Sequence, residues 1–286
     1  MLSYRSRLPR NNGSTGYLSL RCAFLGLLLP AFAAAQPPSV ASINLCTDQL
    51  VLSIADPAQI LSLSWLSADP EESMLASTAR EFPLNYGSAE ELIEIGADIV
   101  IAGSETSPFT RQLLRRLGST VVEIEPAMSL DDIENNLRLV GGAIGRSAEA
   151  ESVVASMRAR VEAIRERRAE PARSAIVVRP GGFTIGRNTL AHELIELAGL
   201  DNRIAELDRW GSLSIEALLS HDPEIIVVMS YRTAEASLAD SVFSHPALVS
   251  LAESSERIAV PARYFACGAP DSLTSAEVLL EQVAVR

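Results

Sequence analysis

The chain has 286 residues, of which 48% are hydrophobic and 21% are charged, a composition typical of one large or two modest globular domains. Its net charge of −12 comes from 24 basic and 36 acidic residues, and every basic residue is an arginine. This acidic balance argues against a nucleic-acid partner and against attachment to an anionic membrane surface, because both need clustered positive charge.

The first 35 residues differ in composition from the rest of the chain. They contain no acidic residue and four arginines, which are Arg5, Arg7, Arg10 and Arg21. The apolar run 22–35 ends in three alanines at 33–35. This order is typical of a secretory signal peptide, so we expect residues 1–35 to be cleaved off near Ala35 and the mature protein to be periplasmic. The apolar run is too short to span a bilayer comfortably, which leaves an uncleaved anchor as the weaker alternative.

Short β-rich runs alternate with helical segments after the signal. In the first half, strands are predicted at residues 40–45, 60–63, 99–102 and 120–124. Helices are predicted at residues 47–54, 106–117 and 130–144. Strands that alternate with helices indicate a mostly parallel sheet covered by helices.

A single long helix is predicted over residues 147–168, which contain neither proline nor glycine. Its apolar residues recur at spacings of three and four along one face, and are Val153, Val154, Met157, Val161 and Ile164. Acidic residues begin the helix, arginines end it and Pro171 stops it. About 22 helical residues span roughly 33 Å, so the helix either joins two lobes or covers a single one.

The second half repeats the alternation of strands and helices. Strands are predicted at residues 175–178, 225–228 and 257–260, and helices at 189–198 and 273–283. We therefore predict an α/β protein with two Rossmann-like lobes, mostly parallel sheets and one long linking helix. The predicted boundaries are residues 36–145 for the first lobe, 146–170 for the linking helix and 171–286 for the second lobe.

Two stretches of the chain resemble each other. Residues 90–102 align without a gap with residues 216–228, and each stretch runs from a glutamate in a short helix to an apolar strand. An aromatic residue and a glycine precede both copies, as Tyr86-Gly87 and Trp210-Gly211, and Ser88 with Glu91 has the spacing of a capping box. Helix–turn–strand units look alike in many α/β proteins, but the matched acids and aromatic–glycine pairs favour a duplicated lobe.

Residues 42–50 and the two repeated stretches resemble the periplasmic cobalamin and ferric-siderophore substrate-binding proteins of ABC importers, over essentially all of residues 38–286. The resemblance implies the class III periplasmic binding protein fold and delivery of a metal chelate to an inner-membrane permease and its ATPase. We expect the protein to be a monomer. The resemblance also implies that Glu90 and Glu216, one in each lobe, dock onto permease arginines. Without it, both would be first-turn acids favoured by the helix dipole.

Aromatic residues on loops near the ends of predicted strands mark the candidate ligand site. By the resemblance to cobalamin binders, the predicted cleft residues are Trp65, Tyr86, Phe183, Trp210 and Tyr264. Aromatic walls suit a bulky, flat chelate because they give a large contact area at a small entropy cost. Core packing is the alternative for each of them. Arg187 is also predicted to contact ligand and Arg263 lies in the same loops, with solvated surface arginines as the alternative.

Cys46 and Cys267 are the two cysteines that follow the signal. An oxidising compartment favours a disulfide between them, which would stabilise the fold by on the order of 4 kcal/mol because it closes a very long loop. Two separate buried thiols are the alternative.

Motifs of catalysis and metal binding are missing from the sequence. His192, His221 and His245 are scattered, and there is no Gly-x-Ser-x-Gly elbow. We therefore predict a protein that is not an enzyme, with no catalytic residues, no cofactor and no metal held by its own side chains. The ligand stays open among a corrinoid, a ferric siderophore and haem. A binder of free metal ions and a scaffold protein with the same fold are the remaining alternatives.

Overall fold

The computed structural model describes residues 37–168, 170–204, 206–212, 214–230 and 238–284. The predicted signal peptide, residues 1–35, and its cleavage near Ala35 lie outside the described residues. By its contacts, Pro37–Arg286 forms one compact unit. None of the helices in the described part of the chain is long and apolar enough to cross a membrane.

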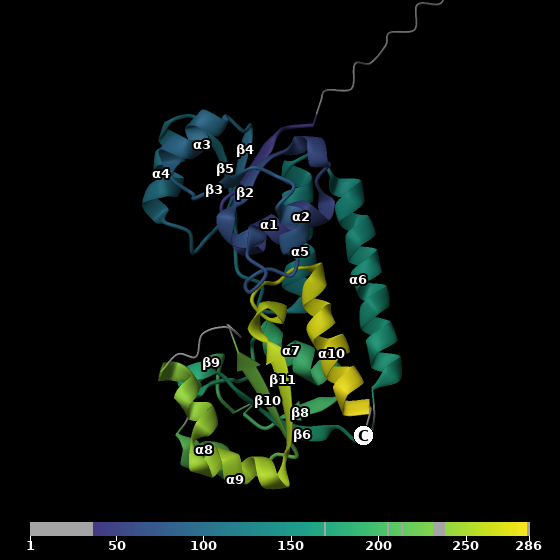
Figure 1. The fold of residues 1–286 in the computed structure, drawn as a ribbon. Helices are drawn as coiled ribbons and strands as arrows, with labels where there is room; N and C mark the ends of the chain where they lie inside the picture. Colours follow the sequence, from purple (N-terminus) through teal and green to yellow (C-terminus); the bar gives the residue numbers. More distant parts are fainter. Residues whose placement is uncertain (1–36, 169, 205, 213, 231–237, 285–286) are drawn as a thin grey trace, which may run out of the picture. The chain divides into compact units, whose positions relative to one another are not determined.

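Five parallel strands form the first sheet, in the order β3-β2-β1-β4-β5 (Figure 1). The strands are β1 Val40–Ser42, β2 Ile60–Ser64, β3 Leu84–Asn85, β4 Ile99–Gly103 and β5 Thr120–Ile124. The helices of this half are α1 Leu45–Ile54, α2 Ala76–Ala79, α3 Ala89–Ile95, α4 Pro108–Arg116 and α5 Leu130–Ala143. This order matches the first five strands of the Rossmann order 3-2-1-4-5-6, and we call the sheet and these helices the first lobe.

The second sheet has four parallel strands in the order β11-β10-β6-β8. They are β6 Arg173–Val178, β8 Leu200–Asn202, β10 Ile225–Ser230 and β11 Glu256–Pro261. A separate antiparallel ribbon pairs β7 Phe183–Ile185 with β9 Trp210–Ser212. Helices α7 Leu190–Leu197, α8 Ile215–Ser220, α9 Pro246–Ser254 and α10 Leu273–Ala284 complete what we call the second lobe.

The predicted strand 40–45 is too long, because a helix cap interrupts it. The Asn44 Oδ1 atom accepts hydrogen bonds from the backbone N–H groups of Cys46 at 2.9 Å and Thr47 at 3.4 Å. The strand therefore stops at Ser42, and α1 begins at Leu45 instead of Thr47.

Helix α6, Ser147–Arg167, has 21 residues and agrees with the predicted long helix. Arg158 on α6 donates to Glu134 on α5, with 2.8 Å between Nε and Oε1. Arg160 on α6 donates to Glu277 on α10, with 3.0 Å between Nε and Oε1. The long helix is thus bonded to the last helix before it and to the final helix of the chain.

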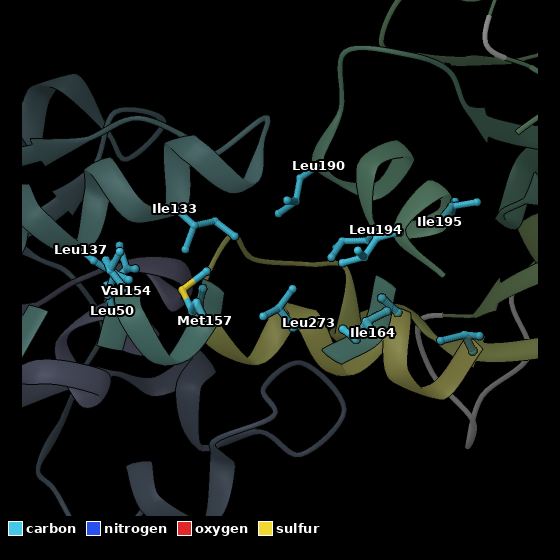
Figure 2. Packing of buried hydrophobic residues seen from close by; sticks show 14 of the residues in the cluster. Leu50, Ile133, Leu137, Val154, Met157, Ile164, Leu190, Leu194, Ile195 and Leu273 are labelled. Carbon is cyan, nitrogen blue, oxygen red and sulfur yellow. The ribbon is translucent and has the colours of Figure 1, made fainter. Parts of the chain in front are cut away.

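One large apolar cluster contains residues of both lobes. Figure 2 shows side chains from α5, α6, α7 and α10 turned toward one another, among them Leu137, Met157, Leu194 and Leu273. The cluster also contains Leu50 of α1. The fold is α/β with mostly parallel sheets, as predicted, and this shared core ties the helices of the two lobes together.

Candidate ligand-binding cleft

A cavity of about 400 Å³ lies among residues that come from both lobes. From the first lobe, the residues at the carboxyl ends of β1, β4 and β5 that line it are Asn44, Gly103, Ser104, Glu105, Glu125 and Pro126. From the second lobe, the lining includes Arg179 after β6, Met229 near the end of β10 and Ala262 after β11. Ligands of open α/β sheets bind at the carboxyl ends of the strands, and the cavity has the size of a small-molecule site.

The floor of the cavity is built by the start of α1 and the segment that leads into α10. Cys46 and Cys267 form a disulfide there, with 4.9 Å between their Cα atoms, so the bridge favoured by the sequence is present. Gly268 lies so close to Ala127 that a Cβ atom at position 268 would overlap the Ala127 side chain. The disulfide therefore joins the two segments, and the glycine lets the second segment pack closely against Ala127 after β5.

Two of the predicted aromatic residues lie on the β7–β9 ribbon. Trp210 lines the cavity, and Phe183 and Trp210 together with Arg179 line a second hollow beside it. Both aromatic side chains are about half exposed, 48% for Phe183 and 52% for Trp210. In the ribbon, Phe183 is the register partner of Ser212, and Ile185 is the register partner of Trp210. Phe183 and Trp210 therefore lie diagonally across the two strands.

Trp65 and Tyr86 form a stacked pair on the first lobe. Their ring centroids are 6.1 Å apart and the ring planes differ by 28°. The two residues meet because Ser64 at the end of β2 is the register partner of Asn85 at the end of β3. Trp65 is 45% exposed and Tyr86 is 78% exposed, and neither is among the described residues that line the cavity.

The structure places the other two predicted residues, Tyr264 and Arg187, and also Arg263 away from the described lining of the cavity. Tyr264 is half-buried against the large apolar cluster, with the Arg263 guanidinium 5.2 Å from the centre of its ring. Arg187 is exposed, and its backbone forms an isolated β-bridge with the backbone of Asp208.

Arg179 is a cavity residue that the sequence analysis missed. Burial lowers the pKa of its guanidinium, which nonetheless stays charged. The first turns of α1 and α7 also line the cavity, and helix N-termini favour anionic groups. The acids Glu105 and Glu125 line the other lobe's side, where the Ser104 hydroxyl donates to Glu125 at 2.6 Å. The position of Arg179 directly after an apolar strand was the signal that could have found it.

Glu90 and Glu216 both lie exposed in the first turn of their helices, α3 and α8. Backbone N–H donation and the Ser214 side chain lower the pKa of Glu216. Ser88 caps α3 by accepting from Glu91 N, but the Glu91 carboxylate accepts from Tyr86 N instead of completing the predicted capping box.

Metal-binding side chains do not converge in the described part of the chain. No group of three or more histidine, cysteine, aspartate or glutamate side chains there could hold a metal ion. The His192 ring lies 3.2 Å from the Asn202 amide, and His221 pairs with Glu206.

Comparison with known proteins matches residues 40–252 to the family described as periplasmic binding protein. The chain belongs to the periplasmic binding protein family. This match covers most of the chain, and it places the protein among solute-binding proteins of transport systems instead of among enzymes.

Some curated proteins resemble this periplasmic binding protein in sequence. A cobalamin-binding protein of Halobacterium salinarum is 26% identical over 198 residues, which cover 67% of this chain and 54% of the relative. An uncharacterised ABC transporter substrate-binding lipoprotein, YvrC of Bacillus subtilis, is 20% identical over 202 residues, covering 67% of this chain and 63% of the relative. The match thus spans only about half the length of the Halobacterium protein.

Solved structures share the fold at low sequence identity. A periplasmic haem-binding protein from Pseudomonas aeruginosa has a TM-score of 0.67 and 21% identity, with 86% of this chain and 93% of the other covered. The periplasmic vitamin B12-binding protein BtuF of Vibrio cholerae has a TM-score of 0.65 and 17% identity, with 87% and 97% covered. The predicted class III fold is confirmed.

Proposed function

We propose that this protein is the substrate-binding component of an ABC importer and that it captures a metal chelate in the cleft. The observation that carries the proposal is the cavity at the carboxyl ends of both parallel sheets, with Trp210 and Arg179 in its wall. A site shared by two lobes can enclose a ligand by a small closing movement. The chemistry is binding and release, without a covalent step.

A corrinoid is the first candidate ligand. The cobalamin-binding relative from Halobacterium supports it, and aromatic side chains at the cleft suit a large, flat, rigid molecule. Ferric siderophores and haem are the alternatives. Haem is kept because a haem-binding protein shares the fold.

Delivery would use one acid on each lobe. Glu90 and Glu216 are exposed on different lobes, so arginines of one permease could pair with both at once. The Bacillus relative supports an ABC transporter as the partner. We also propose that the protein is exported as a monomer and that its signal is removed near Ala35, which N-terminal sequencing of the periplasmic protein would check.

Binding is tested by titrating the protein with cyanocobalamin, a ferric hydroxamate siderophore and haemin while following tryptophan fluorescence. Micromolar or tighter binding of one chelate identifies its class. Equilibrium dialysis, which does not depend on light absorption by the chelate, supplies an independent Kd. Variants Trp210→Phe and Trp65→Phe report which tryptophan the ligand approaches. Failure of all three chelates to bind would contradict the proposal.

Docking is tested by the double charge reversal Glu90→Arg, Glu216→Arg. We expect transport in cells to be lost and the Kd for the chelate to stay unchanged, because neither side chain lines the described cavity. A matched control reverses Glu94 on α3, which is exposed but lies one turn further along the helix. Normal transport by the double variant would rule out these glutamates as docking residues.

A further inference from the structure

A buried polar cluster lies beneath the aromatic pair Trp65–Tyr86. Its members are side chains at the carboxyl ends of β1, β2 and β3, at the start of α1 and in the 3₁₀ helix η2 (Trp65–Ala68). All of them are buried, and they are Ser42, Thr47, Asp48, Ser64, Ser67 and Asn85. The cluster contains one ionisable group, the carboxyl group of Asp48, which is completely buried.

Asp48 holds the residue that immediately precedes Trp65. The Ser64 backbone N–H donates to Asp48 Oδ2 at 3.1 Å. Ser64 is also the N-cap of η2, since its hydroxyl accepts from Leu66 N at 3.3 Å and its carbonyl accepts from the Ser67 hydroxyl at 2.6 Å. The backbone on both sides of Trp65 is therefore fixed through Ser64, and Ser64 is fixed to Asp48.

Tyr86 is fixed by the same cluster from the neighbouring strand. The Asn85 amide donates to the Ser42 carbonyl and to the Ser62 hydroxyl, both at 2.9 Å. The Asn85 Oδ1 atom accepts from Gly87 N at 3.1 Å, so both neighbours of Tyr86 in the chain belong to the network. Trp65 directly follows Ser64 and Tyr86 directly follows Asn85, and both preceding residues are buried members of the hydrogen-bond network.

The second oxygen of Asp48 has no hydrogen-bond partner among the described residues. The hydroxyls of Ser42 and Ser67 face the carboxyl group, but Ser42 pairs with the Thr47 hydroxyl at 2.8 Å and Ser67 with the Ser64 carbonyl. A buried carboxylate with an unsatisfied oxygen is costly, so ionisation must draw donors toward it. The hydroxyls that face the group are those of Ser42 and Ser67, and Ser67 is the one bonded to Ser64 next to Trp65.

We propose that Asp48 is a positioning residue whose buried carboxyl group sets the geometry of the Trp65–Tyr86 pair and changes it when the group ionises. Burial raises the pKa of Asp48 to about 7, and the three serines offset only part of that rise. The consequence for ligand capture rests on the proposed function, whereas the coupling of Asp48 to Trp65 is independent of it.

Charged groups on the elements around α1 do not control this carboxyl group. The sequences of β1, β2, β4 and η2 contain no ionisable side chain, and Cys46 on α1 is in the disulfide. Helices α5 and α6 also pack on α1. Near the loop that joins these two helices, the ionisable groups are Glu134, Arg138, Arg146 and Glu149. They pair with one another or with Glu151 and Arg158. None of them contributes to the pKa of Asp48.

Fluorescence of the ligand-free protein tests the coupling directly. Trp65 and Trp210 are the only tryptophans, so Trp210→Phe leaves Trp65 as the single reporter. All three histidines lie at position 192 or beyond, in the second lobe. We expect the emission of Trp65 to shift in one transition near neutrality when the pH is raised from about 5 to about 9.

Asp48→Asn in the Trp210→Phe background should abolish the transition and keep the low-pH spectrum, because its amide oxygen can still accept from Ser64. Asp48→Ala should shift the spectrum at every pH. The matched control is Asp98→Asn, since Asp98 also accepts from a serine N–H and hydroxyl but lies beside β1 at its amino end. That variant should retain the transition.

A transition that persists in Asp48→Asn, that is absent from the Trp210→Phe parent, or that is also lost in Asp98→Asn would overturn the proposal. Because no ligand is present, none of these outcomes depends on the identity of the chelate or on whether one binds.

Discussion

Asp48 is a carboxyl group with no contact with solvent, placed under the ends of three strands. Its folded-state pKa of about 7 lies well above the ordinary value of 3.8. Between these two values the folded protein binds one more proton than the unfolded chain, so the contribution of Asp48 to stability falls as the pH rises.

The free energy of unfolding should therefore decrease between about pH 4 and about pH 7 by on the order of 4 kcal/mol at most from this residue. Asp48→Asn cannot ionise and should remove that part of the pH dependence, leaving the variant more stable than the parent above neutrality. Urea denaturation at several pH values measures the slope. An unchanged slope in the variant would mean that the carboxyl group keeps an ordinary pKa in the fold.

Arg179 lies in the wall of the cavity although no sequence motif marks it. The sequence drew attention to Arg187, but Arg187 is exposed and lies outside the described lining of the cavity, whereas Arg179 lies in the cavity wall. A guanidinium in a partly desolvated wall makes stronger charge-assisted hydrogen bonds than one in water.

Arg179→Gln should weaken binding of the chelate that the parent protein prefers by about tenfold or more, which corresponds to about 1.4 kcal/mol. Arg187→Gln should cost less. The two Kd values, measured by equilibrium dialysis, decide between the arginine chosen by sequence and the one chosen by structure. A larger loss for Arg187→Gln would reverse our assignment.

Helices α5, α6 and α10 form the layer that connects the sheets. Glu134 on α5 is buried and accepts from Arg158 on α6 with 2.6 Å between Oε2 and the nearest guanidinium nitrogen, and also from Arg138. Hydrogen bonds from Arg158 and Arg138 lower the pKa of Glu134 against the opposing effect of burial. The stabilisation is therefore present above the ordinary glutamate pKa and is lost as the pH falls through the lower folded value.

Glu134→Gln should reduce the free energy of unfolding by about 1–2 kcal/mol at neutral pH, a discounted value because Arg158 is largely exposed. The matched control is Glu162→Gln, which removes an exposed pair with Arg165 on α6 and should have no measurable effect. The difference should vanish below the pKa of Glu134. Equal stabilities of the two variants at neutral pH would contradict the role of Glu134 as a tie between α5 and α6.

Some helices and strands can be predicted from their own residues, and others cannot. The run 147–168 has a long apolar stripe and complementary end charges, so its prediction needed no tertiary information and Ser147–Arg167 confirms it. The β7–β9 ribbon has two strands of three residues, too short for any periodicity, and forms only because each strand has the other as a partner. Phe183 and Trp210 therefore could not be paired from the sequence.

The disulfide acts at the scale of the whole molecule. Cys46 and Cys267 are 221 residues apart in sequence, and their bridge joins α1 of the first lobe to the segment that enters α10. Together with the apolar cluster shared by both lobes, it closes the floor of the cavity. A covalent tie at this place restricts the unfolded chain and holds the two ends of the fold together.

The double variant Cys46→Ser, Cys267→Ser should lower the free energy of unfolding by about 5 kcal/mol in the chain-entropy model. The same loss should follow reduction of the parent protein by a dithiol, and the variant itself should not respond to that reagent. Chemical denaturation with and without the reductant measures both effects. A variant as stable as the oxidised parent would show that the bridge does not constrain the unfolded chain.

The sequence by itself determined the alternation of strands and helices and the long helix, because these depend on local periodicity. It favoured a disulfide between Cys46 and Cys267, and the structure decided that pairing. The sequence also carried the resemblance to chelate-binding proteins. Only the tertiary structure decided which side chains meet in the cleft. Trp210 and Arg179 enter the cavity wall, while Tyr264 packs on the core, because sheet register and the path of each loop set the direction of a side chain. The hydrogen bond between Asp48 and the Ser64 N–H, next to Trp65, depends on the same geometry, since it joins a side chain of α1 to the end of β2.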